Sequence, residues 1–140
     1  MGFASSDKQP VTVELTADHD SVQPGGAAQI SVHFTIEKGW HIYGEHPGDA
    51  GLPTKVTWQG PAEAAFGPLK WPKPRRFRDP GNLKTFGYTG KVALSSSLTA
   101  STKASSPLPI RAKVEWLACK ELCVPGSAQL DLSLPVSSAP

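Results

Sequence analysis

The chain has 140 residues, of which 39% are hydrophobic and 19% charged, and its formal net charge is +2. This length suits one domain, and so small a positive charge gives no reason to expect nucleic-acid binding. Fourteen prolines and thirteen glycines are many for a helical protein and favour short strands joined by frequent turns. No apolar run approaches the roughly 18 residues of a membrane span, and the first residues lack the apolar core of a signal peptide.

The ends of the chain differ in composition from its middle. The start has no regular pattern, and the last residues are rich in serine, alanine and proline, which is typical of a flexible linker. We expect a disordered segment over residues 1–9, one folded domain over 10–135 and the beginning of a linker over 136–140. On this interpretation the chain is one domain of a longer protein.

Several stretches alternate apolar and polar residues with the period of two that is typical of a half-buried strand. The predicted strands cover residues 11–16, 30–36, 40–43, 54–58, 92–98, 110–116 and 130–134. His33 falls on the outward face of the second of them and is interpreted as a solvated residue. Seven or eight short strands with turn signals between them predict an all-β fold, an immunoglobulin-like antiparallel β-sandwich with little helix.

The segments between these strands carry glycine, proline and polar residues. Residues 44–53 are too rich in glycine and proline for regular strand pairing, and residues 62–65 could form one helical turn. Two prolines within 69–77 predict an edge strand or an extended crossover. Residues 83–90 are interpreted as an aromatic, glycine-bearing loop, and residues 95–106 as a loop or strand edge.

Four basic residues follow closely on one another at Lys73, Arg75, Arg76 and Arg78. Such a cluster usually forms a solvated face of the protein. The more specific alternative is a surface that docks onto an acidic partner.

Both cysteines of the chain lie in the stretch Trp116–Gly126, which contains a Pro-Gly pair interpreted as the end of this element. Three residues separate Cys119 from Cys123, and this spacing suits a tight hairpin in which the two cysteines face each other. Facing Cα atoms in a hairpin lie about 4.5–5.5 Å apart, within the span of a disulfide. The pair can therefore be joined or left open with little backbone movement, as a redox switch requires.

A static structural bridge is the alternative interpretation of this pair, and it is common in exported β domains. Closing a five-residue ring removes little entropy from the unfolded chain, about 2 kcal/mol against about 4.7 kcal/mol for a 100-residue loop. A bridge within one hairpin thus stabilises the fold only weakly. The spacing alone leaves both interpretations open, the redox switch and the static structural bridge.

Five pieces of the sequence together match one family pattern. They are Gly39-Trp-His-Ile-Tyr43, Pro47-Gly-Asp-Ala-Gly-Leu-Pro-Thr54, Trp71-Pro-Lys-Pro74, Phe86-Gly-Tyr-Thr-Gly90 and the cysteine stretch Trp116–Gly126. In order and spacing they resemble the periplasmic N-terminal domain of the DsbD and ScsB type of thiol:disulfide interchange proteins, over about residues 10–135. Better-known DsbD members place more residues between their cysteines, so the short spacer is closer to the ScsB-like branch.

This resemblance implies a disulfide oxidoreductase domain that works through a reversible Cys119–Cys123 bridge. It implies a periplasmic location in a protein anchored in the inner membrane, with electrons supplied by a membrane-embedded domain of the same natural chain. The implied acceptors are thioredoxin-like periplasmic proteins, and we expect the domain itself to be monomeric. By analogy with the family, Cys123 attacks and Cys119 resolves, although the residues themselves do not decide between the two.

The resemblance also implies a cap, in which an aromatic loop covers the disulfide and moves aside for the right partner. Phe86 is the candidate for the shielding ring, with Tyr88 beside it, and glycines 87 and 90 would let the loop swing. The alternative is that both rings are ordinary core aromatics. Tyr43 and His41 match positions near the site in the family.

Two other functions are weighed against exchange. The reduced cysteines, with His41 or His46, could bind Cu(I), which prefers soft ligands. However, the cysteine spacing is not a zinc signature and the chain has a single methionine, so we expect neither a metal nor a cofactor. The third possibility is an adhesive or carrier sandwich with a static disulfide.

Overall fold

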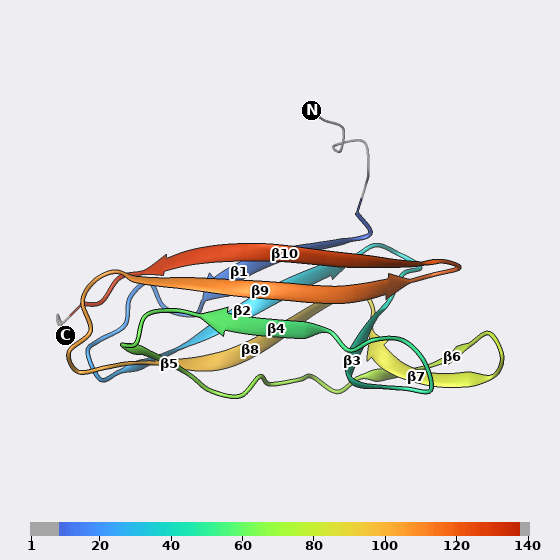
Figure 1. The fold of residues 1–140 in the computed structure, drawn as a ribbon, viewed down its shortest axis with the longest axis horizontal. Helices are drawn as coiled ribbons and strands as arrows, with labels where there is room; N and C mark the ends of the chain where they lie inside the picture. The colour runs from blue at the N-terminus through green and yellow to red at the C-terminus, as the bar shows by residue number, and fades with distance from the viewer. Residues whose placement is uncertain (1–8, 138–140) are drawn as a thin grey trace, which may run out of the picture.

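The computed structural model describes residues 9–137 and contains strands but no helix in that range. The strands are β1 (Val11–Ala17), β2 (Ala27–Ile36), β3 (Ile42–Gly48), β4 (Lys55–Gln59), β5 (Ala64–Phe66), β6 (Arg75–Asp79), β7 (Leu83–Tyr88), β8 (Lys91–Ala100), β9 (Leu108–Cys119) and β10 (Cys123–Leu134) (Figure 1). Within this range there is accordingly no helix that could cross a membrane.

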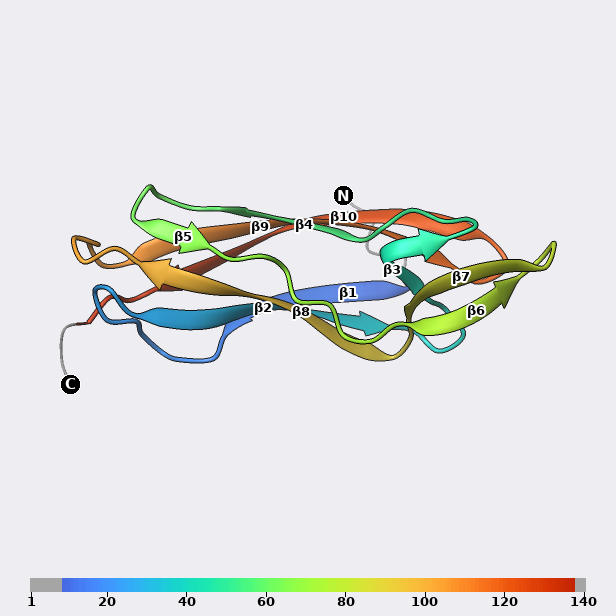
Figure 2. The same ribbon diagram turned by 90° about the horizontal axis from the view of Figure 1, so that it is seen from below.

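Three antiparallel sheets make up the fold. A four-stranded sheet in the order β1-β2-β8-β5 faces a three-stranded sheet in the order β10-β9-β4, and the two layers are seen edge-on in Figure 2. The third sheet, β3-β7-β6, lies at one end of the sandwich, beside the tip of the β9–β10 hairpin (Figures 1 and 2). The predicted immunoglobulin-like antiparallel β-sandwich is confirmed.

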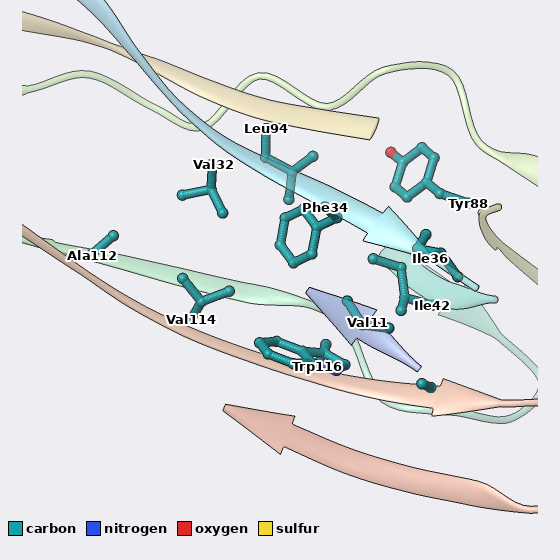
Figure 3. Close-up of a cluster of buried hydrophobic side chains, with 11 residues drawn as sticks. Val11, Val32, Phe34, Ile36, Ile42, Tyr88, Leu94, Ala112, Val114 and Trp116 are labelled. Atoms are coloured by element: carbon teal, nitrogen blue, oxygen red, sulfur yellow. The ribbon is translucent and has the colours of Figure 1, made fainter. Parts of the chain in front are cut away.

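The alternating residues of facing strands fill the space between the two layers. Val32 and Phe34 from β2 point toward Val114 and Trp116 from β9 (Figure 3). The rings of Phe34 and Trp116 meet edge to face with centroids 6.1 Å apart, a favoured arrangement for aromatic pairs. Each such side chain contributes about 1.5–3 kcal/mol when fully buried, so the period-two pattern is what holds the layers together.

The prediction of a loop over residues 83–90 is wrong. Residues 83–88 form β7, the central strand of the third sheet, which pairs with β3 on one side and β6 on the other. Gly87 is the physical reason, because a Cβ at this position would collide with the carbonyl oxygen of Ile42. The glycine therefore serves close strand packing rather than freedom of movement.

Three other boundaries differ from expectation. Residues 62–63 form a turn and lead into β5, so the predicted helical turn is wrong. Strand β8 continues to Ala100, because it pairs with β2 on one side and with β5 on the other, and the buried Ser96 hydroxyl accepts a hydrogen bond of 2.9 Å from the Trp58 indole. Strand β3 extends to Gly48, although its pairing with β7 is broken between Tyr43 and Gly48.

The last strand is longer than expected at its start. Strand β10 runs through Pro125 and Gly126, so the predicted stop is wrong; β10 lies at a sheet edge, where a proline is tolerated. Of the predicted disordered segment, residues 1–8 lie outside the described residues, as do 138–140 of the predicted linker. Val136 pairs with Val22 in a parallel bridge.

Candidate functional site

The two cysteines lie at the tip of the β9–β10 hairpin. Cys119 ends β9, Cys123 begins β10, and the two residues are directly paired and joined by a disulfide with a Cα–Cα distance of 4.1 Å. The turn between them is closed by a hydrogen bond of 2.9 Å from the Lys120 N–H to the Leu122 carbonyl. The prediction that the cysteines face each other across a hairpin is confirmed.

A third chain segment fixes the backbone of Cys119 from its other side. The His41 N–H donates to the Cys119 carbonyl at 3.0 Å, and the Cys119 N–H donates to the His41 carbonyl at 2.9 Å. Because both backbone groups of Cys119 are used by His41, its pair with Cys123 is the narrow, non-hydrogen-bonded kind that suits a disulfide. Directly paired residues project to the same side, so His41, Cys119 and Cys123 form a row across three strands.

The two cysteines differ in accessibility. Cys119 is 3% exposed, whereas Cys123 is exposed to solvent. Leu122, which precedes Cys123 in the turn, is 75% exposed. An incoming thiolate therefore finds Cys123 open and Cys119 covered.

Hydrogen bonds tie His41 to a buried tyrosine and a carboxylate. His41 Nε2 lies 3.2 Å from the Tyr43 hydroxyl, which donates to Asp79 Oδ2 at 3.4 Å, and Thr85 donates to the same oxygen at 3.2 Å. Since the single Tyr43 proton goes to Asp79, His41 Nε2 carries the hydrogen of the first bond and Nδ1 is free to accept a proton.

Burial and the Asp79 charge both act on the acid–base properties of this group. Burial raises the pKa of Tyr43 to about 12, and Asp79 adds to the effect, so the phenol keeps its proton at neutral pH. Burial lowers the pKa of His41, and the opposing attraction of Asp79 does not cancel this. The imidazole is accordingly neutral at pH 7.

Strand β6 supplies an aromatic ring next to this histidine. The rings of Phe77 and His41 stack with centroids 4.5 Å apart, and the Arg75 guanidinium lies 5.7 Å from the Phe77 centroid. The three side chains line an open hollow of about 560 Å³. Sequence reasoning missed Phe77 and Asp79. The available signal was that residues 75, 77 and 79, as every second residue of a strand, lie on the same face.

The two predicted cap residues lie elsewhere on the hairpin of β6 and β7. Phe86 is paired with Arg76, whereas Phe77 is paired with Thr85, so Phe86 and Phe77 lie on opposite faces of the hairpin. Phe86 is half-buried and lines a different hollow, with Trp71 among its other walls.

Tyr88 belongs to the core. It is 5% exposed, burial raises its pKa, and its hydroxyl donates to the Pro72 carbonyl at 2.7 Å. Hydrogen bonds thus connect Tyr43 through His41 to Cys119, whereas Phe86 and Tyr88 project from the face of β7 opposite to Thr85, the residue that bonds to Asp79.

The four basic residues of the cluster are all exposed, and β6 is an edge strand, as one of the two predictions for this region stated. Arg75 donates to the Thr89 hydroxyl and Arg78 to the Asn82 side chain, each at 3.0 Å. Docking of this cluster onto an acidic partner stays a prediction.

Ligands for a metal do not gather within residues 9–137. No group of three or more His, Cys, Asp or Glu side chains in that range is placed to hold an ion. His46, one proposed copper ligand, is highly exposed and lies 3.6 Å from the carboxylate of Glu45. The disulfide joins both sulfurs that a Cu(I) ion would need.

The fold and the site together define an immunoglobulin-like domain that presents a disulfide with one covered and one open cysteine. The family model for the N-terminal domain of the thiol:disulfide interchange protein DsbD matches residues 7–135. The chain belongs to this family of DsbD N-terminal domains. Its paired cysteines have the geometry that disulfide oxidoreductase activity needs.

Two solved structures share the fold. The N-terminal periplasmic domain of ScsB from Proteus mirabilis superposes with a TM-score of 0.69 at 19% identity, covering 96% of this chain and 51% of that one. The N-terminal domain of DsbD from Neisseria meningitidis, in its reduced form, gives a TM-score of 0.55 at 16% identity, covering 96% and 95%. This chain thus spans about half the length of the ScsB structure. A comparison with curated protein sequences found no match.

Proposed function

We propose that the Cys119–Cys123 disulfide is the working redox centre of a periplasmic domain that passes reducing equivalents to oxidised proteins. The observation that carries the proposal is the asymmetry of the pair, with Cys119 buried and Cys123 exposed at the tip of a hairpin. Family membership supports a membrane-embedded domain of the same natural chain, in an inner-membrane protein, as the electron donor. Thioredoxin-like periplasmic proteins are the proposed acceptors.

Loading of the domain begins at Cys123. A donor thiolate attacks the Cys123 sulfur, the Cys119–Cys123 bond breaks, and Cys119 leaves as a thiolate that takes up a proton. A second donor thiol then displaces Cys123 from the mixed disulfide. The bridge has gained two electrons and two protons, and the donor is left as a disulfide.

Unloading reverses these roles. The Cys123 thiolate attacks the disulfide of an oxidised acceptor and forms a mixed disulfide. Cys119 then attacks Cys123, closes the ring and releases the acceptor with both thiols reduced. The directly paired backbone positions keep the resolving sulfur within reach of its partner throughout.

His41 is the proposed positioning residue for the proton at Cys119. Its backbone is directly paired with that of Cys119, and its Nδ1 can accept a proton while Nε2 stays bonded to Tyr43. A thiolate that forms at a buried position has little water to stabilise it. During unloading, the neutral imidazole can instead take the proton that the Cys119 thiol gives up as it attacks Cys123, so that the thiolate forms beside a cation.

Phe77 is the proposed shield of the site, in place of Phe86. Its ring stacks on His41 and so lies close to the row that leads to the cysteines, while Phe86 faces the opposite side of the hairpin. Phe77 lies on β6 and Phe86 on β7 of the same hairpin. The cap proposed from the resemblance therefore stays in this hairpin, with Phe77 as the shielding ring instead of Phe86.

Single-cysteine variants test the exchange proposal. A Cys119→Ser domain keeps the exposed thiol and should form a stable mixed disulfide with a chromogenic aromatic disulfide. A Cys123→Ser domain keeps the covered thiol and should react at least about tenfold more slowly, with no electron transfer to an oxidised thioredoxin-like protein. Full transfer by Cys123→Ser would exclude the mechanism.

The two candidate rings are tested as a matched pair. We expect Phe77→Ala to speed the reaction of the disulfide with a small thiol such as mercaptoethanol several-fold, because a covering ring is removed. Phe86→Ala is the control on the other face and should leave the rate near that of the wild type. The reverse order of rates would return the shielding role to Phe86.

A further inference from the structure

We propose that an apolar surface beside the disulfide binds the partner segment that carries the reactive cysteine, through an apolar side chain next to that cysteine. The apolar rim, as it is called here, consists of Leu52, Pro53 and Pro125, which line one groove, and of Leu122 in the turn between the two cysteines. The inference rests on the proposed exchange function and assigns the specificity of the same site.

Two leucines of the apolar rim are unusually open to water. Leu52 is 61% and Leu122 is 75% exposed, and they are the large hydrophobic residues left exposed within residues 9–137. Leu122 stands between the two cysteines in the turn. Scattered exposed leucines need no explanation, but two at the disulfide end of the molecule mark an interaction surface.

A groove lies along β10 and begins at Pro125, two residues beyond Cys123. It has a volume of about 510 Å³ and is lined by Leu52, Pro53 and Pro125, with Trp116 beneath Gly126. Pro125 is two residues after Cys123 on β10, so both project from one face of the strand about 7 Å apart. This spacing is within reach of a side chain adjacent to a partner cysteine whose sulfur is bonded to Cys123.

The loop that carries Leu52 is fixed to the redox site. Gly51 has φ +89°, and a Cβ there would lie 2.6 Å from the ring of Tyr43. Tyr43 in turn is hydrogen-bonded to His41, which pairs with Cys119. The groove wall and the disulfide are thus held by one set of contacts, and the groove is formed before a partner arrives.

The charges of the groove favour an uncharged occupant. Its charged lining residues are Lys55 and Glu115, which are of opposite sign and directly paired across β4 and β9. They leave no net charge to attract an acidic or a basic segment. A leucine-like or aromatic side chain beside the partner cysteine is therefore the occupant that the groove fits.

Two uncharged pentapeptides test the proposal, one with leucine and one with serine on both sides of a single cysteine. Formation of the mixed disulfide with the oxidised domain is followed by mass spectrometry at fixed pH, and each rate is divided by the rate with mercaptoethanol for the same protein. We expect the leucine peptide to react about five- to tenfold faster than the serine peptide, as burial of one such side chain allows. Leu52→Ser and Leu122→Ser should each reduce the ratio of the leucine-peptide rate to the serine-peptide rate. The exposed substitution Ala62→Ser, remote from the groove, should leave that ratio unchanged.

The rates with the peptides and with mercaptoethanol distinguish a failure of the apolar rim from a failure of the exchange function. Equal rates for the two peptides, or a leucine preference that survives in both leucine variants, would overturn the apolar rim and leave the exchange function intact. A disulfide that no thiol opens, mercaptoethanol included, would overturn the exchange function and this inference with it.

Discussion

His41 links the backbone of the buried cysteine to a titratable network. Its main chain holds Cys119 through two hydrogen bonds, while its ring contacts Phe77 and Tyr43. Asp79 on β6 is bonded to Tyr43, and the hollow that His41 lines also contains Arg75 on β6 and Glu37 and Lys38 in the turn before β3. Proton affinity at His41 therefore depends on how the third sheet packs against the hairpin.

The lowered pKa of His41 predicts a pH dependence of stability. Because the folded-state pKa lies below the unfolded value of about 6.5, the unfolded chain binds more protons between the two values. The contribution of His41 is thus complete above pH 6.5 and is lost as the pH falls toward its folded pKa.

Urea unfolding at pH 7 and pH 5 measures this effect. We expect His41→Gln to show a smaller loss of unfolding free energy on acidification than the wild type. His33→Gln, at an exposed histidine on β2, is the control for removing a histidine elsewhere. Identical losses in the wild type and His41→Gln would contradict the assignment.

At the scale of elements, β7 decides where the third sheet sits. It pairs with β3 and β6 at once, and its close approach to β3 is possible because Gly87 has no side chain. β3 leads on from His41, so any displacement of β7 reaches the backbone partner of Cys119. The third sheet is thereby part of the redox site rather than an appendage to the sandwich.

Two glycines of this sheet give a matched test. Gly87→Ala should lower the free energy of unfolding by about 1–3 kcal/mol, because the added methyl group meets the Ile42 carbonyl. Gly44→Ala, whose new methyl group would lie 3.7 Å from the Tyr88 ring, should change it by about 0.5 kcal/mol or less. Equal effects in chemical denaturation would show that the close approach does not limit the sheet.

For the whole molecule, stability and redox chemistry are separable. The sandwich is held by two buried clusters between its layers, one around Phe34 and Trp116 and the other around Ile30 and Ile110. The disulfide closes a ring within one hairpin at the end of the structure and connects no distant elements. We therefore expect the domain to open and close this bond without losing its fold.

Reduction of the disulfide tests this separation. In the chain-entropy model a five-residue ring contributes about 2 kcal/mol, so we expect the reduced domain to remain folded with an unfolding free energy lower by about that amount. Circular dichroism and urea unfolding with and without a phosphine reductant measure the difference. Unfolding on reduction would indicate a structural staple instead.

The sequence by itself determined the fold class and the pairing of the cysteines. Both follow from short-range features: the period of two in strands such as β2 and β9, and the three residues between Cys119 and Cys123. A strand with one buried face must alternate, and a three-residue turn must bring its ends together.

Only the tertiary structure decided which residues surround the disulfide. Phe77 and Asp79 reach the site because β6 pairs with β7 and β7 with β3, and the backbone of Cys119 is held by His41, which lies far earlier in the chain. The register between strands distant in sequence sets these contacts. A local pattern that assigned the glycine-bearing segment 83–90 to a loop carried no information about the neighbour that Gly87 would meet.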